Sequence, residues 1–154
     1  MSGHGQRQGL VTDRETIALV RVVFDGFNAR QLERVAAICG DDFTLEDIPA
    51  GLTLRGPAGM QLWLQTWLDA APDAHVALAR IFGDGDWVAT EHHGTATHTG
   101  PLRTPTGAIP PTGRALDLWF SENFEVTNGK LRRMRVYYDG ATMMRQLGLL
   151  AISY

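Results

Sequence analysis

The dipeptide Asn128-Gly129 lies between two runs in which apolar and polar residues alternate, 116–126 and 131–138. Asn-Gly favours the positive backbone angles of a two-residue turn whose twist matches that of the flanking strands. An apolar residue at every second position is typical of strands with one buried face. The segment therefore predicts a long antiparallel hairpin, and its apolar face requires further strands or helices to cover it.

Three helical patterns precede this hairpin. Thr12 and Glu15 fit a capping box that begins a helix ending near Asn28. Asn28 is also a residue type that caps helices, so we expect it to start a second helix that stops at Gly40. Pro57 suits the first turn of a third helix, because its missing N–H has no partner there in any case.

The other segments are extended. We expect strands at 43–47, 76–82 and 87–99, a long loop at 100–113 and a final short helix near 141–149. Helices followed by strands indicate an α+β domain in which the helices pack on one face of an antiparallel sheet. A sheet that curves around such helices encloses a conical cavity, so a pocket is expected at its open end.

Composition limits the partners of this domain. The 154 residues carry a formal charge of −3 without a basic cluster, which disfavours nucleic acid and anionic membranes. No apolar run is long enough to cross a bilayer, and a cytoplasmic location is expected. The only cysteine, Cys39, follows a small apolar run and is interpreted as a buried hydrophobic residue. We expect a flexible segment over 1–11 and a single domain over 12–154.

Strand alternation also predicts which polar side chains enter the cavity. On the apolar faces lie four polar residues, which we predict to be catalytic: His92, His98, Glu122 and Tyr138. Each has a structural alternative. The histidines are often satisfied core residues, Glu122 would reach water if a bulge reverses its face, and Tyr138 would serve as a cavity wall. Asp139 precedes Gly140 and fits a helix cap better than a catalytic group.

The apolar residues of the same faces and of the third and last helices are predicted to bind substrate: Trp63, Trp67, Phe120, Phe124, Met134, Val136 and Met143. On the opposite face, Trp87, Trp119 and Tyr137 are exposed aromatics, which predicts that a homodimer covers them. The loop 100–113 is proline-rich and long, and is interpreted as a lid. No metal or other cofactor is predicted, because no third ligand joins His92 and Glu122.

A set of short motifs resembles the SnoaL-like branch of the NTF2-like superfamily. In the order of that family the chain contains Phe27-Asn28-Ala29, Arg55-Gly56-Pro57-Ala58-Gly59, Gly83-Asp84-Gly85-Asp86-Trp87-Val88, Thr97-His98-Thr99-Gly100, Ile109-Pro110-Pro111-Thr112-Gly113-Arg114, Asn128-Gly129-Lys130-Leu131 and Gln146-Leu147-Gly148. The resemblance implies a cone-shaped α+β barrel with a strongly curved antiparallel sheet, and a role as a polyketide cyclase.

The resemblance also implies a difference in chemistry. Family members that close aromatic rings by aldol condensation carry a His-x-Asp pair on the last strand, and those positions correspond to Met134 and Val136 here. Neither residue transfers a proton. We therefore expect ring closure on a small, largely apolar polyketide or polyene by a [4+2] cycloaddition. The alternatives are an aldol cyclase that uses Glu122, His92 or Asp139, and a non-catalytic binding protein.

Overall fold

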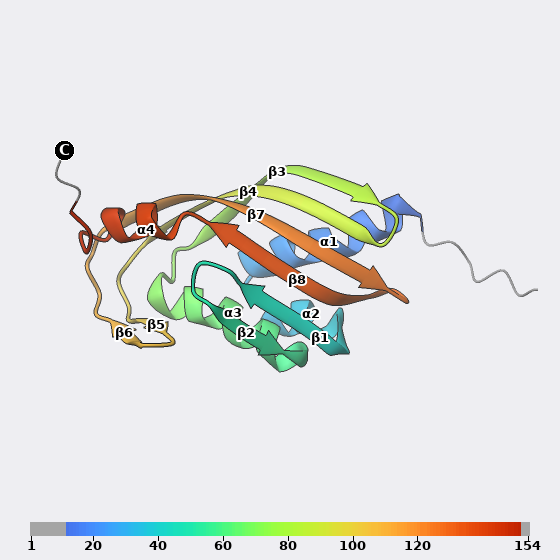
Figure 1. The fold of residues 1–154 in the computed structure, drawn as a ribbon, viewed down its shortest axis with the longest axis horizontal. Helices are drawn as coiled ribbons and strands as arrows, with labels where there is room; N and C mark the ends of the chain where they lie inside the picture. The colour runs from blue at the N-terminus through green and yellow to red at the C-terminus, as the bar shows by residue number, and fades with distance from the viewer. Residues whose placement is uncertain (1–11, 152–154) are drawn as a thin grey trace, which may run out of the picture.

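The computed structural model describes residues 12–151 and is shown in Figure 1. The elements are α1 (Asp13–Asn28), α2 (Leu32–Ala37), β1 (Cys39–Asp47), β2 (Leu52–Arg55), α3 (Gly56–Ala70), β3 (His75–Asp84), β4 (Trp87–Thr97), β5 (Leu102–Thr104), β6 (Gly107–Ile109), β7 (Ala115–Thr127), β8 (Lys130–Tyr138) and α4 (Gly140–Gln146). The flexible segment predicted for residues 1–11 lies outside the described residues.

A six-stranded sheet has the order β2-β1-β8-β7-β4-β3. The hairpin at Asn128-Gly129 is confirmed, since β7 and β8 pair antiparallel across it. The sequence predicted an antiparallel sheet, but β1 and β8 run parallel, so the sheet is mixed. No tight turn joins these two strands. Most of the chain separates them, and a connection of that length allows the parallel direction.

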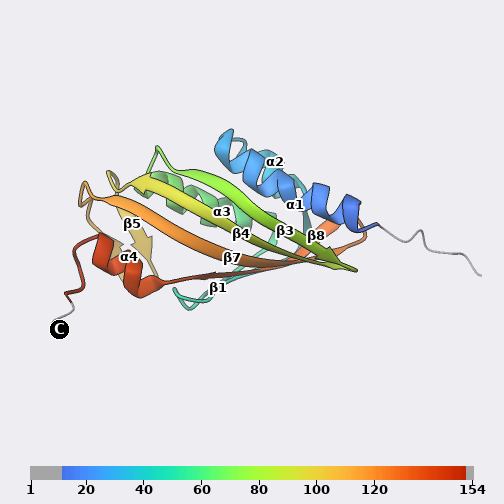
Figure 2. The same ribbon diagram turned by 90° about the horizontal axis from the view of Figure 1, so that it is seen from above.

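The helices α1, α2 and α3 lie against one face of the curved sheet (Figures 1 and 2). The capping box at Thr12 and Glu15 is confirmed. Asn28 does not cap the second helix, which starts after Gln31 instead. The side chain of Asn28 is bound to the backbone of Val76, donating to its carbonyl at 2.8 Å and accepting from its N–H at 2.9 Å. This pair of bonds fixes the end of α1 against β3.

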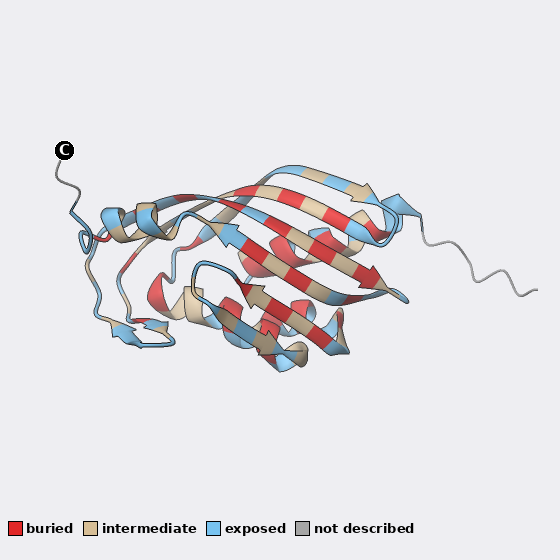
Figure 3. Cartoon of the chain, in the orientation of Figure 1, coloured by how far each residue is buried: buried red, intermediate tan, exposed pale blue. Residues whose placement is uncertain are grey.

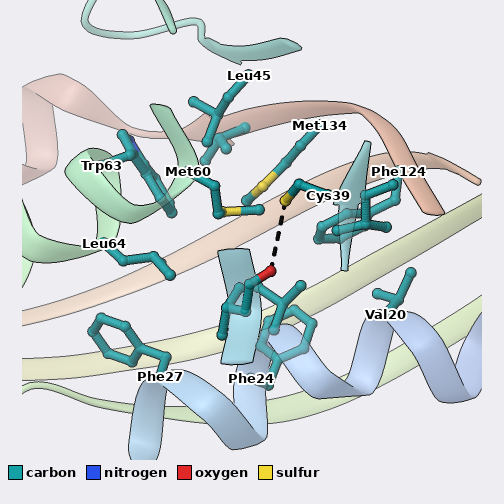
Figure 4. Packing of buried hydrophobic residues seen from close by; sticks show 14 of the residues in the cluster. Val20, Phe24, Phe27, Cys39, Leu45, Met60, Trp63, Leu64, Phe124 and Met134 are labelled. Carbon is teal, nitrogen blue, oxygen red and sulfur yellow. Dashed lines mark hydrogen bonds between the residues drawn. The ribbon is translucent and has the colours of Figure 1, made fainter. Parts of the chain in front are cut away.

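The core lies between these helices and the sheet. Burial alternates along β7 and β8, which confirms the predicted faces (Figure 3). Val20, Phe24 and Phe27 of α1 face Phe124 and Met134 of the sheet across the core (Figure 4). Cys39 is buried and donates a weak hydrogen bond to the Val35 carbonyl, as expected of a small core residue. Its burial raises the pKa of the thiol to about 12.

The segment 100–113 is more ordered than its composition suggests. It contains the hairpin of β5 and β6, whose Leu102 is buried in a second core cluster with Ala70, Leu116 and Leu147. No residue of 100–113 lines the cavity described below, so the interpretation of this loop as a lid has no support in this geometry. The sequence did not predict β5 and β6, because each is only three residues long and prolines flank both strands.

The convex face of the sheet carries the three aromatic residues that alternation assigned to it. Trp87, Trp119 and Tyr137 are 46%, 54% and 40% exposed. The homodimer inferred from them stays a prediction. No helix within residues 12–151 has the length and apolar content needed to span a membrane.

Candidate functional site

A cavity lies between α1, α3 and the concave face of the sheet. The cavity has a volume of about 70 Å³ open to the centre of a water molecule, and about 610 Å³ when all of the empty space that continues into solvent is included. The wall is largely apolar and includes five large aromatic side chains from α1, α3 and β7: Phe24, Phe27, Trp63, Trp67 and Phe120. The paired residues His75 and Thr95 are exposed and mark the opening beside the start of β3. Such a cavity suits a ligand that is largely apolar.

Glu122 lies in this wall, deep in the molecule. Only 2% of its surface is exposed, and its Oε2 atom has no hydrogen-bond partner within the described residues. Desolvation, together with the charge of Asp47, raises the pKa of its carboxyl group to about 8. Glu122 is therefore a neutral carboxylic acid at pH 7 and has a proton to donate. The alternative in which a bulge turns Glu122 to water is wrong, because the bulge in β7 follows Glu125.

His92 lies beside Glu122 on β4. Its ring stacks on Phe120 at 4.8 Å between centroids and meets the edge of Phe24 at 5.1 Å. Burial, and to a smaller extent the charge of His93, lowers the pKa of the imidazole to about 4. The ring is consequently neutral at pH 7 and has a nitrogen that accepts protons.

The two groups face one another without a hydrogen bond. The distance between His92 Nδ1 and Glu122 Oε2 is 3.9 Å, too long for a hydrogen bond, and neither atom has another partner. Buried polar atoms are normally paired, so two unpaired ones that face each other in a cavity wall indicate a place for a polar group of a ligand.

Tyr138 lies next to this pair, but its hydroxyl points elsewhere. Its ring packs against Trp67 and Phe120, with centroids 5.9 and 5.1 Å away. The hydroxyl donates to Asp47 Oδ2 at 3.3 Å. Burial, followed by the Asp47 carboxylate, raises the pKa of Tyr138 above its ordinary value. Tyr138 therefore packs behind the lining residues Trp67 and Phe120 and is not itself part of the cavity wall, so neither of its predicted roles in the cavity is supported by this geometry.

Asp47 is a buried polar residue behind the cavity wall that the sequence reasoning missed. It ends β1 and is 4% exposed. Phe43, Leu45 and Asp47 are buried while Thr44 and Glu46 are less so, and the same period-two rule applied to this short strand would have found it.

His98, the fourth predicted catalytic residue, is not part of the cavity wall. It is fully buried just after β4, and its Nδ1 accepts a hydrogen bond from the backbone N–H of Thr112 at 3.3 Å. Burial lowers the pKa of its imidazole. This histidine holds the segment that leads into β7, while its Nε2 atom has no hydrogen-bond partner within the described residues.

Four of the predicted substrate-binding residues also lie outside the cavity lining. Phe124, Met134 and Val136 are fully buried in the core, and Met143 packs against that core from α4. The alternation of apolar and polar residues identified the face of the sheet correctly, but it does not indicate which residues of that face line the cavity and which fill the core. Asp139 is exposed and caps α4 by accepting from the Thr142 N–H at 3.1 Å, which confirms the capping interpretation.

Glu122 should make stability depend on pH. Its folded pKa of about 8 exceeds the ordinary value of 4.5, so folding retains a proton that the unfolded chain has lost. This contribution is complete below about pH 4.5 and is lost as the pH rises toward 8, by at most about 1.4 kcal/mol per unit. Urea unfolding at several pH values should show wild type losing stability relative to Glu122→Gln over this range.

An exposed carboxylate provides the control for this measurement. Glu33 lies on the exposed side of α2, so Glu33→Gln makes the same chemical change away from the cavity and controls for the substitution itself. A stability difference between wild type and Glu122→Gln that does not change with pH would contradict the raised pKa of Glu122.

The family and the structural relatives agree with this architecture. Residues 17–147 match the sequence model of the SnoaL-like polyketide cyclases, and the chain belongs to this family. Among curated proteins, none matches the sequence closely enough to be called a relative. The site thus sits in a protein with the cyclase role that defines the family.

Solved structures show the same fold at low sequence identity. A proposed SnoaL-like polyketide cyclase from Jannaschia sp. CCS1 superposes with a TM-score of 0.80 at 16% identity, covering 94% of this chain and 98% of that one. AclR, a proposed hydroxylase from Streptomyces galilaeus, gives 0.77 at 21%, covering 93% and 91%. IdmH, a proposed polyketide cyclase from Streptomyces antibioticus, gives 0.71 at 23%, covering 86% and 98%. These likenesses establish the NTF2-like cone.

The described residues contain no cluster of three or more His, Cys, Asp or Glu side chains arranged to hold a metal ion.

Proposed function

We propose that this cyclase closes a carbocycle on a largely apolar polyketide or polyene by a [4+2] cycloaddition. The observation that carries the proposal is the cavity itself, an aromatic-rich chamber in which the neutral acid Glu122 lies 3.9 Å from the neutral base His92 without a hydrogen bond between them. Met134 and Val136, at the positions of the family's acid/base pair, are buried in the core and have no proton to transfer.

The chamber contributes mainly by holding the chain folded. Bringing two reacting ends together contributes up to about 7–11 kcal/mol to lowering a barrier. In the cycloaddition two carbon–carbon bonds form from the π electrons of a diene and an alkene, so no proton or electron enters or leaves. Glu122 donates a hydrogen bond to a carbonyl conjugated with the alkene and stabilises the negative charge that develops there.

An intramolecular aldol reaction is the second candidate, and the 3.9 Å gap between His92 and Glu122 favours it. In that reaction His92 removes a proton from the carbon beside one carbonyl. The enolate attacks a second carbonyl and forms the new bond, and Glu122 protonates the resulting alkoxide. Asp139 takes no part, because it is exposed at the start of α4.

Purified protein tests the proposal with two linear probes. One is a polyene with a diene and an α,β-unsaturated ketone, and the other is a poly-β-ketone. We expect a cyclic isomer of the polyene, detected by mass spectrometry and NMR, with the poly-β-ketone unchanged. Cyclisation of only the poly-β-ketone would support the aldol reaction. Binding without turnover of either probe would overturn both and favour a non-catalytic binding protein.

Two residues of α3 provide a matched pair of variants for this assay. Trp67 lines the cavity, whereas Leu62 on the same helix is 53% exposed. Trp67→Ala should lower the rate about 10- to 100-fold through looser positioning of the chain, and Leu62→Ala should leave it unchanged. Equal rates in both variants would contradict the role of the cavity walls.

A further inference from the structure

A second buried carboxyl group, that of Asp47, lies behind the cavity wall and accepts hydrogen bonds from three donors. Its Oδ2 accepts from Trp63 Nε1 at 2.9 Å and from the Tyr138 hydroxyl at 3.3 Å, and its Oδ1 accepts from the Ala50 N–H at 3.1 Å. Donors of this number stabilise the ionised form of a carboxylic acid. The Asp47 carboxyl group therefore has three hydrogen-bond donors although it is buried.

Glu122 has the opposite environment on the same face of the sheet. Asp47 on β1 pairs with Val136 on β8, and Val136 pairs with Glu122 on β7. The two carboxyl-bearing residues therefore lie in one cross-strand row, two strands apart, which corresponds to about 10 Å between their backbones. No side-chain hydrogen bond reaches the Glu122 carboxyl, and its Oε2 is unpaired.

The unequal donors decide which carboxyl group ionises. Two buried carboxylates of like charge repel one another, so the first to ionise makes ionisation of the second harder. Asp47 has three donors and the Glu122 carboxyl group has none within the described residues, so the hydrogen bonds favour placing the charge of the pair on Asp47. In agreement, the Asp47 charge is one of the two causes that raise the pKa of Glu122, after desolvation.

The other groups near Glu122 do not change this assignment. On the same face, His92 of β4 is neutral and Tyr138 of β8 directs its hydroxyl to Asp47. The helices packed on this part of the face contribute rings of Phe24, Trp63 and Trp67 to the cavity wall.

We propose that Asp47 is a positioning residue for Glu122: by carrying the negative charge of this carboxyl pair, it keeps the proton on Glu122, where the substrate needs it. The inference deepens the proposed function, on which it rests for the use of that proton. It also assigns Tyr138 and Trp63 a shared task. Each of these two side chains has one polar hydrogen, and each donates a hydrogen bond to Asp47.

Infrared spectroscopy tests the inference without any substrate. The C=O stretch of a protonated carboxylic acid is separate from the bands of ionised carboxylates, so the band reports Glu122 directly during a pH titration. Wild type should show this band at pH 7 with a midpoint near pH 8. In Asp47→Asn the midpoint should fall by roughly one pH unit, since a nearby like charge is removed.

Three further variants make the result decisive. Asp47→Ser removes the same charge while keeping an acceptor oxygen near Trp63, and it replaces Asp47→Asn if that variant does not fold. Glu46→Gln is the matched control, because Glu46 lies on the same strand, faces the other way and pairs with Arg135. It should leave the midpoint unchanged. Glu122→Gln should remove the whole band at pH 7.

Two results would overturn the inference. One is a midpoint that stays in place when the Asp47 charge is removed. The other is a protonated carboxyl band at pH 7 that survives Glu122→Gln, because Asp47 would then hold the proton. Neither result depends on catalysis, so failure of this inference and failure of the proposed cyclisation are observed separately.

Discussion

Glu122→Leu is expected to lower the rate of ring closure about 10²–10³-fold, the usual cost of removing one preorganised donor to a developing oxyanion. Leucine fills a similar volume but gives no hydrogen bond to the carbonyl. Glu122→Gln should retain the rate to within about tenfold, because its amide group still donates although it transfers no proton. Single-turnover rates with the polyene probe measure both effects.

His92→Phe serves as the companion variant. Phenylalanine preserves the stacking on Phe120 and removes the basic nitrogen. In a cycloaddition its rate should stay near that of wild type, and the rate should be flat with pH until Glu122 ionises near pH 8. A collapse of 10²-fold or more in both His92→Phe and Glu122→Gln would replace the cycloaddition with the aldol reaction.

Val136→Asp is expected to lower the free energy of unfolding by about 3–5 kcal/mol at pH 7, which is the usual cost of a buried charge without a partner. Val136 is fully buried and pairs with Asp47 on one side and Glu122 on the other. A third carboxyl group in this row would be desolvated and repelled by Asp47, which raises its pKa in the folded state. The loss should shrink as the pH falls and the new group is protonated in both states.

Val136→Thr separates charge from polarity at this position. Threonine has nearly the shape of valine and buries a hydroxyl group, at a cost of about 1–3 kcal/mol. Urea unfolding of both variants at pH 7 and at a lower pH makes the comparison. If Val136→Asp were no less stable than Val136→Thr, the buried row of carboxyl groups would not be as described.

The fold could be predicted to the extent that its signals are local. The turn at Asn128-Gly129 and the cap at Thr12 each depend on a few neighbouring residues, and both were correct. Alternation also placed His92 and Glu122 on one face, because the side-chain period of a strand is independent of its partners. The pairing of β1 with β8 had no such signal, since it joins segments from opposite ends of the chain.

The candidate site was predicted only in part for the same reason. Asp47 belongs to it through Trp63 and Tyr138, which approach it from α3 and β8. These hydrogen bonds join residues that are far apart in the sequence, so no local pattern predicts them. Conversely, Phe124 shares a face of β7 with Glu122, which lines the cavity, yet lies in the core, because a cone has both a filled and a hollow part.

The position of β8 between β1 and β7 has a consequence for biosynthesis. During translation β1 and β7 leave the ribosome before the strand that will separate them, so each exposes unpaired backbone groups at a temporary edge. The sheet is complete only after Tyr138, the last residue of β8, has emerged and β8 has paired with both neighbours. The pairing of β1 with β8 joins distant segments and forms slowly relative to the β7–β8 hairpin. The nascent chain is therefore most exposed to aggregation and chaperone binding before β1 and β8 have paired.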